Sequence, residues 1–303
     1  MSELARKLST TVGQVLRGKD DAIELAIVTL FAGGHLLIED NPGVGKTLLA
    51  RSLAKALDLP FQRVQCTADL LPADIVGGQV YNPRSGELTF RPGPVFTSVL
   101  LADELNRTPP RTQSALLECM AERSVTVDRH THALPEPFFV VATQNPISAA
   151  GTYPLPENQL DRFLLRIRLG YPEPEHEIDV VAQEDGHRLA ADVRAVATRD
   201  DLLATRRQVD AVRCDRELAA FVVELANRTR QHGDLLLGVS TRGAQALHRA
   251  CRARALVHGR DYVVPDDVRA LLVPAFGHRM HLRGGADVEA VLHEILATTP
   301  LPE

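Results

Sequence analysis

A glycine-rich segment between an apolar run and a helical pattern constrains this chain more than any other feature of its sequence. The run His35-Leu36-Leu37-Ile38 has the composition of a buried strand, and residues 48–57 repeat apolar side chains at helical spacing. Between them stands Gly43-Val44-Gly45-Lys46-Thr47. Its glycines allow backbone N–H groups to converge on phosphate oxygens, the helix N-terminus adds a favourable dipole, and Lys46 can reach the terminal phosphates. The segment therefore predicts a loop that binds the phosphates of ATP, with these candidate contacts: Asn41, Pro42, Gly43, Val44, Gly45, Lys46, Thr47 and Leu48.

Asp40 departs from the usual form of such a loop. The template G-x-x-x-x-G-K-[ST] has a glycine at the position that Asp40 occupies here. An acid beside the phosphates disfavours the nucleotide by charge repulsion, unless its side chain turns outward or caps a backbone N–H. Asp40 therefore keeps open the alternative of a nucleotide-gated scaffold that binds ATP with little turnover.

An acidic pair, Asp103-Glu104, follows a second apolar run at Val99 to Ala102. In a phosphate-loop protein, Asp103 would hold Mg²⁺ through water and Thr47 would ligate the ion directly. Glu104 would polarise the water that attacks the γ-phosphate. We therefore expect Mg²⁺ at Thr47 and Asp103, with Glu104 as a catalytic residue.

The rest of the pattern predicts two domains joined by a linker. As far as Tyr171, apolar runs alternate with helical stretches, which indicates a parallel sheet covered by helices on both faces. Further strands are expected at residues 61–65, 98–102, 138–143 and 164–169, and inserted β-hairpins at 77–94 and 124–137. The later pattern is helical, with helices expected at 175–189, 200–209, 215–230, 243–258, 266–275 and 288–297. We expect a core over 1–171, a linker and connecting helix over 172–199, and an all-α domain over 200–303.

Composition restricts the partners and the compartment. The chain has 34 lysines and arginines against 39 aspartates and glutamates, so it lacks the overall positive charge of a nonspecific nucleic-acid binder. The arginine-rich stretch 199–260 has almost no interleaved aromatic residues, so no nucleic-acid partner is expected. The four cysteines form no C-x-x-C pair, and no signal peptide or membrane span is visible, so we expect a cytoplasmic protein with no membrane insertion.

Five ordered motifs together resemble the MoxR family of AAA+ ATPases, over about residues 20–267. They are Gly43 to Thr47, Leu101 to Arg107, Gln113 to Glu118, Ala142 to Pro146, and Leu160-Asp161-Arg162-Phe163. The resemblance implies an α/β fold: a P-loop AAA+ core with a parallel sheet and two inserted β-hairpins, followed by an all-α lid domain. It also implies a ring, usually a hexamer, with ATP bound between subunits and hydrolysed with Mg²⁺.

The resemblance assigns three further catalytic residues. Asn145 matches sensor 1, which helps to position the lytic water. Arg162 matches the arginine finger, which reaches the γ-phosphate of a neighbouring subunit. Arg242 matches sensor 2, which contacts the phosphates and couples the lid to the nucleotide state, although Thr241 stands where the family usually has proline. The two hairpins take the places of the helix 2 insert and the hairpin before sensor 1, facing the pore or a client.

The function that the resemblance implies is chaperone-like remodelling or maturation of a partner protein, driven by ATP hydrolysis. In this family the partner is often a protein with a von Willebrand factor A domain. Two alternatives stay open, namely the nucleotide-gated scaffold and a chelatase-type ATPase subunit for metal insertion. A fold and a motor do not by themselves specify the cargo.

Overall fold

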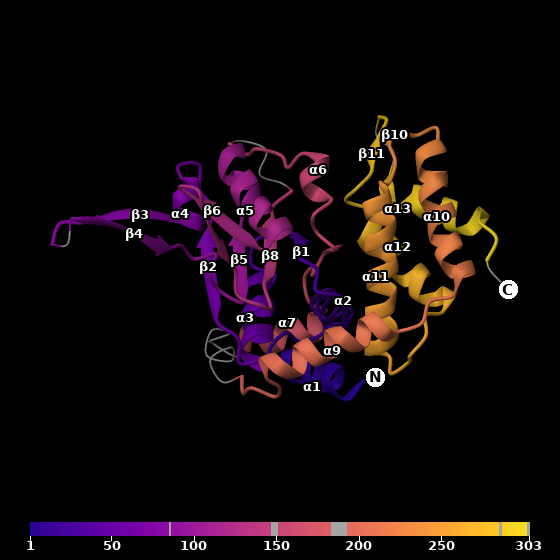
Figure 1. Cartoon of the computed structure of the whole chain (residues 1–303). Helices are drawn as coiled ribbons and strands as arrows, with labels where there is room; N and C mark the ends of the chain where they lie inside the picture. The colour runs from indigo at the N-terminus through magenta and orange to yellow at the C-terminus, as the bar shows by residue number, and fades with distance from the viewer. Residues whose placement is uncertain (85, 147–150, 183–192, 285–286, 302–303) are drawn as a thin grey trace.

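A five-stranded parallel sheet forms the centre of the chain (Figure 1). The computed structural model describes residues 1–84, 86–146, 151–182, 193–284 and 287–301. The sheet order is β2-β5-β8-β1-β9, so the strand that precedes the glycine-rich loop lies between two neighbours. The expected strands are all present: β1 (Leu36–Glu39), β2 (Phe61–Gln65), β5 (Val99–Asp103), β8 (Phe139–Gln144) and β9 (Leu165–Ile167).

Alternate residues of each strand divide the core into two apolar layers. In β1, Leu36 and Ile38 belong to one buried cluster, whereas Leu37 belongs to the other. In β5, Leu101 and Leu100 divide in the same way. This period of two follows from the pleat, and burial on both faces explains why these strands are continuous apolar runs.

Helices cover both faces of the sheet. One layer packs against three helices near the N-terminus: α1 (Glu3–Gly13), α2 (Asp20–Phe31) and α3 (Lys46–Ala56). The other layer includes the buried side of α5 (Pro110–Glu122). Three short elements complete this region: α4 (Pro72–Val76), the 3₁₀ turn η1 (Leu105–Arg107) and α6 (Glu157–Leu160).

Both expected hairpins are present. β3 (Gly77–Asn82) pairs antiparallel with β4 (Glu87–Pro92), and this hairpin extends away from the body of the molecule (Figure 1). The second hairpin joins β6 (Ser124–Val127) to β7 (His130–Ala133). The rings of Phe90 and His132 stack with centroids 4.0 Å apart, so the two hairpins contact each other.

The C-terminal part is helical, as predicted. Its helices are α9 (Arg199–Ala211), α10 (Arg216–Gln231), α11 (Thr241–Val257), α12 (Pro265–Phe276) and α13 (Val288–Thr298). In the view of Figure 1, α10 to α13 stand beside the sheet on the side away from the long hairpin, whereas α9 runs below the sheet near α1. The helix expected at 175–189 is seen as α7 (Pro174–Ala182), and its remainder lies outside the described residues. The helical part also contains a short antiparallel strand pair that was not predicted, β10 (Leu235–Leu237) with β11 (His281–Leu282). Strands this short give no periodic signal in the sequence.

The C-terminal helices share the apolar layer of α2. Leu225, Leu247 and Leu271 belong to the same buried cluster as Ile27 and Phe31 of α2. The helical part is therefore packed continuously onto the core, as a single apolar layer.

Among the described residues, no helix has the length and apolar content that crossing a bilayer requires.

A buried carboxylate joins three segments of the helical part. The Asp267 side chain has no exposed surface and accepts charged hydrogen bonds from Arg254 (2.8 Å) and Arg260 (2.7 Å). Arg254 also pairs with Glu24 of α2 at 3.3 Å. The network therefore ties α11 and α12 to the N-terminal helices. Burial opposes ionisation of Asp267, but hydrogen bonds from Arg260, the Val264 N–H and Arg254 outweigh it and lower the pKa of this carboxyl.

Replacing Asp267 with Asn is expected to lower the free energy of unfolding by about 3–5 kcal/mol, because two partly buried arginines lose their shared counter-charge. Since the folded pKa of Asp267 is depressed, its contribution is present above the unfolded pKa of about 4 and is lost as the pH falls through the folded value. Denaturant unfolding from about pH 7 down to about pH 3 measures both effects. The control is Asp266→Asn, which removes an exposed pair with Arg269 and is expected to change stability little. Equal losses in both variants would contradict the role of burial.

Candidate nucleotide site

Two glycines in left-handed conformations shape the predicted phosphate loop. Gly43 has φ +84° and Gly45 has φ +100°, which side chains rarely adopt. A Cβ at Gly45 would also stand 2.7 Å from Leu16 Cδ1. Gly45 is the N-cap of α3, so the loop presents the helix N-terminus directly after β1.

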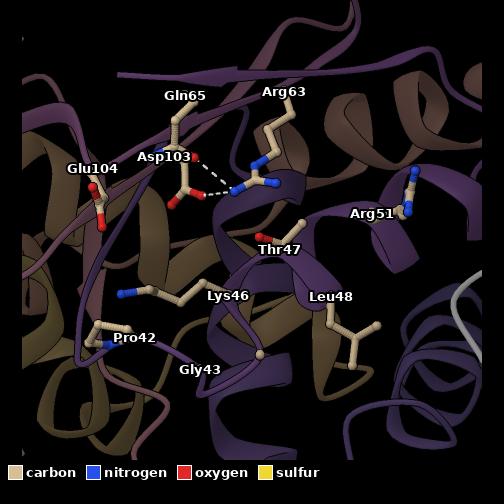
Figure 2. A pocket seen from close by; sticks show the side chains of 11 residues that line it. Pro42, Gly43, Lys46, Thr47, Leu48, Arg51, Arg63, Gln65, Asp103 and Glu104 are labelled. Atoms are coloured by element: carbon tan, nitrogen blue, oxygen red, sulfur yellow. Dashed lines mark hydrogen bonds and ion pairs between the residues drawn. The ribbon is translucent and has the colours of Figure 1, made fainter. Parts of the chain in front are cut away.

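The loop opens into a cavity of about 450 Å³ at the carboxyl ends of β1, β2 and β5 (Figure 2). This is within the usual size range of small-molecule sites. Most predicted contacts line it: Pro42, Gly43, Gly45, Lys46, Thr47 and Leu48, together with Asp103 and Glu104. Two predicted contacts are not among the lining residues: Val44 is buried in the core, and the Asn41 N–H donates to Asp40.

The Asp40 carboxylate is used inside the fold. One oxygen accepts the N–H groups of Leu169 and Gly170, both at 2.6 Å, and the other accepts the Asn41 N–H at 2.8 Å. The Asp40 backbone carbonyl accepts a hydrogen bond from Lys46 Nζ at 2.6 Å. Asp40 is among the buried residues and does not line the cavity. The acid at the first loop position therefore caps the end of β9 and helps to hold Lys46.

The acidic pair ends β5 in a distinctive local geometry. Asp103 Oδ1 accepts a hydrogen bond from the Thr143 hydroxyl at 2.7 Å, and the same hydroxyl accepts the Glu104 N–H at 2.8 Å. Glu104 has φ +58°, an uncommon conformation for a residue with a side chain. Arg107 pairs with the Glu104 carboxylate at 2.8 Å. Thr143 of β8 therefore fixes both members of the pair.

Lys46 lies beneath the two carboxylates (Figure 2). Burial lowers the pKa of its ammonium group, while the charges of Asp40, Asp103 and Glu104 oppose that shift. The cavity thus combines one lysine and a helix N-terminus on one side with two carboxylates on the other. This suits a phosphate chain that carries a divalent cation.

Three cavity residues were not predicted from the sequence. Arg63 donates to Gln65 Oε1 (2.8 Å) and to Asp103 Oδ2 (2.6 Å), and Arg51 lines the same cavity (Figure 2). The sequence held a signal for each of them. Arg63 and Gln65 alternate with buried Val64 on β2 and so share one face of the strand. Arg51 is four residues beyond Thr47 on α3 and so shares its face of the helix.

Asn145 directly follows β8, near the acidic pair in the sheet but not among the residues that line the cavity. It is largely buried, and its carbonyl accepts a hydrogen bond from Asn106 at 3.3 Å. Its position after the strand adjacent to β5 is the one expected of sensor 1.

Arg162 and Arg242 lie together at a different place. Both line a second cavity of about 360 Å³ with Gly33, Gly34 and His35, the residues that precede β1. The phosphate loop follows β1, and this strand of four residues alone spans about 13 Å. The structure therefore separates these two predicted catalytic residues from the chain's own phosphate loop and brings them to the opposite end of β1.

Asp161 links the second cavity to the helical part. Its carboxylate accepts hydrogen bonds from Arg279 Nε (2.7 Å) and from Ser240 Oγ (3.0 Å), the N-cap of α11. Arg279 is buried and also donates to the carbonyls of Phe163 and Leu164. Arg162 follows Asp161, and Arg242 is in the first turn of α11. One carboxylate therefore holds the two segments that carry the arginines.

Two family models match the chain in the same order as the two parts of the fold. The model for the ATPase family associated with various cellular activities (AAA) matches residues 35–165. The model for the AAA lid domain matches residues 227–295. The phosphate loop, the acidic pair and the strands β1, β2, β5 and β8 fall within the first match, which ends at the first residue of β9. The second match includes α11, α12 and most of α13. The fold and the site thus define an AAA ATPase with its lid.

Individual relatives identify the family. YeaC of Bacillus subtilis is 47% identical, over 96% of this chain and 92% of its own. Chaperone MoxR1 of Mycobacterium tuberculosis is 37% identical, over 96% of this chain and 81% of its own. A crystal structure from Cytophaga hutchinsonii superposes with a TM-score of 0.91 at 36% identity, covering 99% of this chain and 96% of the other. A more distant match, at 24% identity, is the magnesium-chelatase subunit ChlI of Mesostigma viride, over 69% of this chain and 61% of its own. The chain belongs to the MoxR family of AAA+ ATPases, and it is a nucleotide-binding ATP hydrolase.

Replacing Asp40 with Gly would complete the usual loop template, yet it is expected to damage the protein. The loss of three hydrogen bonds to the carboxylate should lower the free energy of unfolding by about 2–4 kcal/mol. ATP affinity should not rise, because the carboxylate does not face the cavity. Calorimetry measures both quantities. The control is Asp58→Gly, at an exposed position with φ +50°, where glycine is expected to be neutral or stabilising. Tighter ATP binding by Asp40→Gly would contradict this assignment.

Proposed function

We propose that this ATPase works as a ring of six subunits, with each ATP bound between two of them. The observation that supports this is the separation of Arg162 and Arg242 from the phosphate loop, at opposite ends of β1. A subunit alone therefore does not bring Arg162 or Arg242 to its own phosphate loop. If subunits pack so that this arginine-lined cavity meets the neighbour's phosphate loop, the site is complete.

Within one subunit, the proposed roles follow the lining of the first cavity. Lys46 and the N-terminus of α3 bind the β- and γ-phosphates, and Glu104 orients and deprotonates the attacking water with the help of Asn145. Thr47 and Asp103 offer a hydroxyl and a carboxylate oxygen to the same cavity, a donor set that fits Mg²⁺ held jointly with substrate phosphates. When bound, Mg²⁺ would neutralise charge on the phosphates. The bound ion would compete with Arg63, which pairs with Asp103 here.

Glu104→Gln is expected to lower kcat by about 10²–10⁴-fold, because the amide cannot accept the proton of the attacking water. The KM for ATP should change much less, since the phosphate loop is intact. Steady-state ATPase assays and nucleotide-binding titrations measure the two separately. The control is Glu217→Gln, the same change at an exposed site on α10. Unchanged turnover in Glu104→Gln would refute the assignment and revive the nucleotide-gated scaffold.

Mixing variants tests action between subunits. Arg162→Ala and Lys46→Ala should each be inactive alone, the first by about 10³–10⁵-fold in kcat. A mixture should regain activity. Where the phosphate loop of an Arg162→Ala subunit meets a Lys46→Ala neighbour, the first subunit supplies an intact Lys46 and the second an intact Arg162. Activity across a range of mixing ratios, with oligomeric mass measured in parallel, gives the answer. Normal activity of Arg162→Ala alone would exclude the finger role.

The proposed output is chaperone-like remodelling or maturation of a partner protein, with a von Willebrand factor A domain protein as the expected client. The relative named Chaperone MoxR1, which matches nearly the whole chain, supports this direction. The protruding β3–β4 hairpin carries exposed Tyr81 and Leu88, which are suited to gripping a client. The chelatase alternative has weaker support, since that relative is 24% identical and matched over 61% of its length. The scaffold alternative depended on Asp40 facing the phosphates, whereas its carboxylate binds Leu169 and Gly170.

We further propose the division of the chain into a nucleotide-binding core over 1–171, a linker with a connecting helix over 172–199 and a lid over 200–303. The proposed place of action is the cytoplasm, with no nucleic-acid partner. The net charge of −5 supports the proposed lack of a nucleic-acid partner.

A further inference from the structure

Three arginines converge on one turn at the inner end of the second cavity. Gly33, in the turn between α2 and β1, has φ +63°. Arg123 donates to the Gly33 carbonyl at 3.2 Å, and Arg206 donates to the neighbouring Leu30 carbonyl at 3.1 Å. A Cβ built on Gly33 would be 3.3 Å from an Arg249 guanidinium nitrogen and 3.5 Å from Arg206 Cζ. Guanidinium groups from α5, α9 and α11 therefore gather around a single glycine.

These three charges have no acidic ion-pair partner among the described residues. Within the part of the chain that the structure describes, no carboxylate oxygen forms an ion pair within 4 Å of Arg123, Arg206 or Arg249. One terminal nitrogen of Arg206 is buried without a hydrogen-bond partner among those residues. Burial, followed by the charges of Arg123 and Arg249, lowers the pKa of Arg206 to about 10. Asp210 and Glu136 act on the cluster only from beyond ion-pair distance.

His35, which lines the same cavity, does not change this balance. His35 accepts the Val140 N–H at Nδ1 and faces the Met120 carbonyl through Nε2, so its proton is on Nε2. Burial lowers the pKa of His35 to about 3, so the ring is neutral near pH 7. Asp161, which lines the same cavity, is already bound by Arg279 and Ser240. Among the described residues the cluster therefore has no carboxylate partner. The Leu30 and Gly33 carbonyls at the C-terminal end of α2 compensate part of its charge, and an anion would compensate the rest.

We propose that Arg123, Arg206 and Arg249 form a phosphate-binding site at the α2–β1 turn, separate from the phosphate loop. Guanidinium groups bind phosphate oxygens in pairs, and several around one point suit a multiply charged oxyanion better than a single carboxylate. The cavity of about 360 Å³ has room for a phosphate or pyrophosphate group. Arg123 and Arg249 line this cavity alongside Arg162 and Arg242.

The phosphate could come from two sources. One is the terminal phosphates of a neighbouring subunit's nucleotide, an origin that rests on the proposed ring. The other is free phosphate or pyrophosphate, which needs no ring. The chemistry of recognition is the same in both, so the experiment has one arm for the site and one for the source.

The first arm measures binding of inorganic pyrophosphate by calorimetry. The parent variant is the full chain with Lys46→Ala, in which the phosphate loop contributes least to pyrophosphate binding. Adding Arg123→Gln and Arg249→Gln is expected to weaken binding at least about tenfold, because charge-assisted hydrogen bonds are lost. The matched control adds Arg111→Gln and Arg207→Gln instead, which remove the same charge from exposed positions on α5 and α9. No binding by the parent, or equal weakening in both variants, would overturn the proposal.

A stability measurement excludes a purely structural role. In phosphate-free buffer, Arg249→Gln alone is expected to leave the unfolding midpoint unchanged or to raise it, because it relieves repulsion between like charges. The same variant should lose the rise in midpoint that pyrophosphate gives the parent. A large drop without ligand would mean that Arg249 supports the fold, contrary to the proposal.

The second arm identifies the source in the chain with Lys46 intact. If the neighbour's nucleotide is the ligand, Arg123→Gln with Arg249→Gln should raise the KM for ATP about tenfold or more relative to the control pair. If the ligand is free phosphate, the ATPase parameters stay unchanged while pyrophosphate binding is lost. Failure of the ring to form leaves the pyrophosphate arm intact, so the two failures are distinguishable.

Discussion

The common direction of the five strands is the constraint on which the rest of the structure depends. Because all the strands are parallel, their carboxyl ends meet at one edge of the sheet and their amino ends at the other. The phosphate loop after β1 and the acidic pair at the end of β5 are brought together at the first edge. The turn before β1 and the loop before β9 are brought together at the second, which is why Arg162 lies far from Lys46. The predicted site residues are therefore divided between the two edges of the sheet.

Three carboxylates held within the fold help to fix the two edges of the sheet relative to the lid. Asp40 caps the end of β9, Asp161 joins the loop before β9 to Arg279 and Ser240, and Asp267 joins α11 to α12. Each accepts at least two hydrogen bonds, from arginines, backbone N–H groups or a hydroxyl, which compensate for its removal from water. The apolar layer shared by α2 and the lid helices adds non-directional packing. Movement of the lid relative to the core would therefore have to break or carry along the contacts of Asp161.

The arginines differ in whether a carboxylate of the fold pairs with them. Arg254 and Arg260 pair with buried Asp267, and Arg279 pairs with partly exposed Asp161; these pairs hold the fold together. The Arg162 guanidinium donates to the Leu117 carbonyl at 3.0 Å, and within the described residues its buried Nε has no hydrogen-bond partner. Charges left uncompensated in a cavity are poised for an external anion, whereas paired charges are not. The arginines of this chain thus differ in their surroundings: some pair with carboxylates, whereas others, such as Arg162, line a cavity without a carboxylate partner among the described residues.

The sequence by itself determined the strand–loop–helix unit, the five parallel strands, the two hairpins and the helical C-terminal part, because each has a local periodicity or turn composition. It also identified most residues that line the nucleotide cavity, since a glycine- and lysine-bearing loop between strand and helix, followed by an acidic pair at a later strand end, is a combination typical of such sites. It could not give the direction of the Asp40 side chain, the part of Arg63 and Thr143 in holding Asp103, or the meeting of Arg123, Arg206 and Arg249 at Gly33. Those depend on contacts between residues far apart in the chain, and no local pattern records which side chains packing will bring within a hydrogen bond of each other.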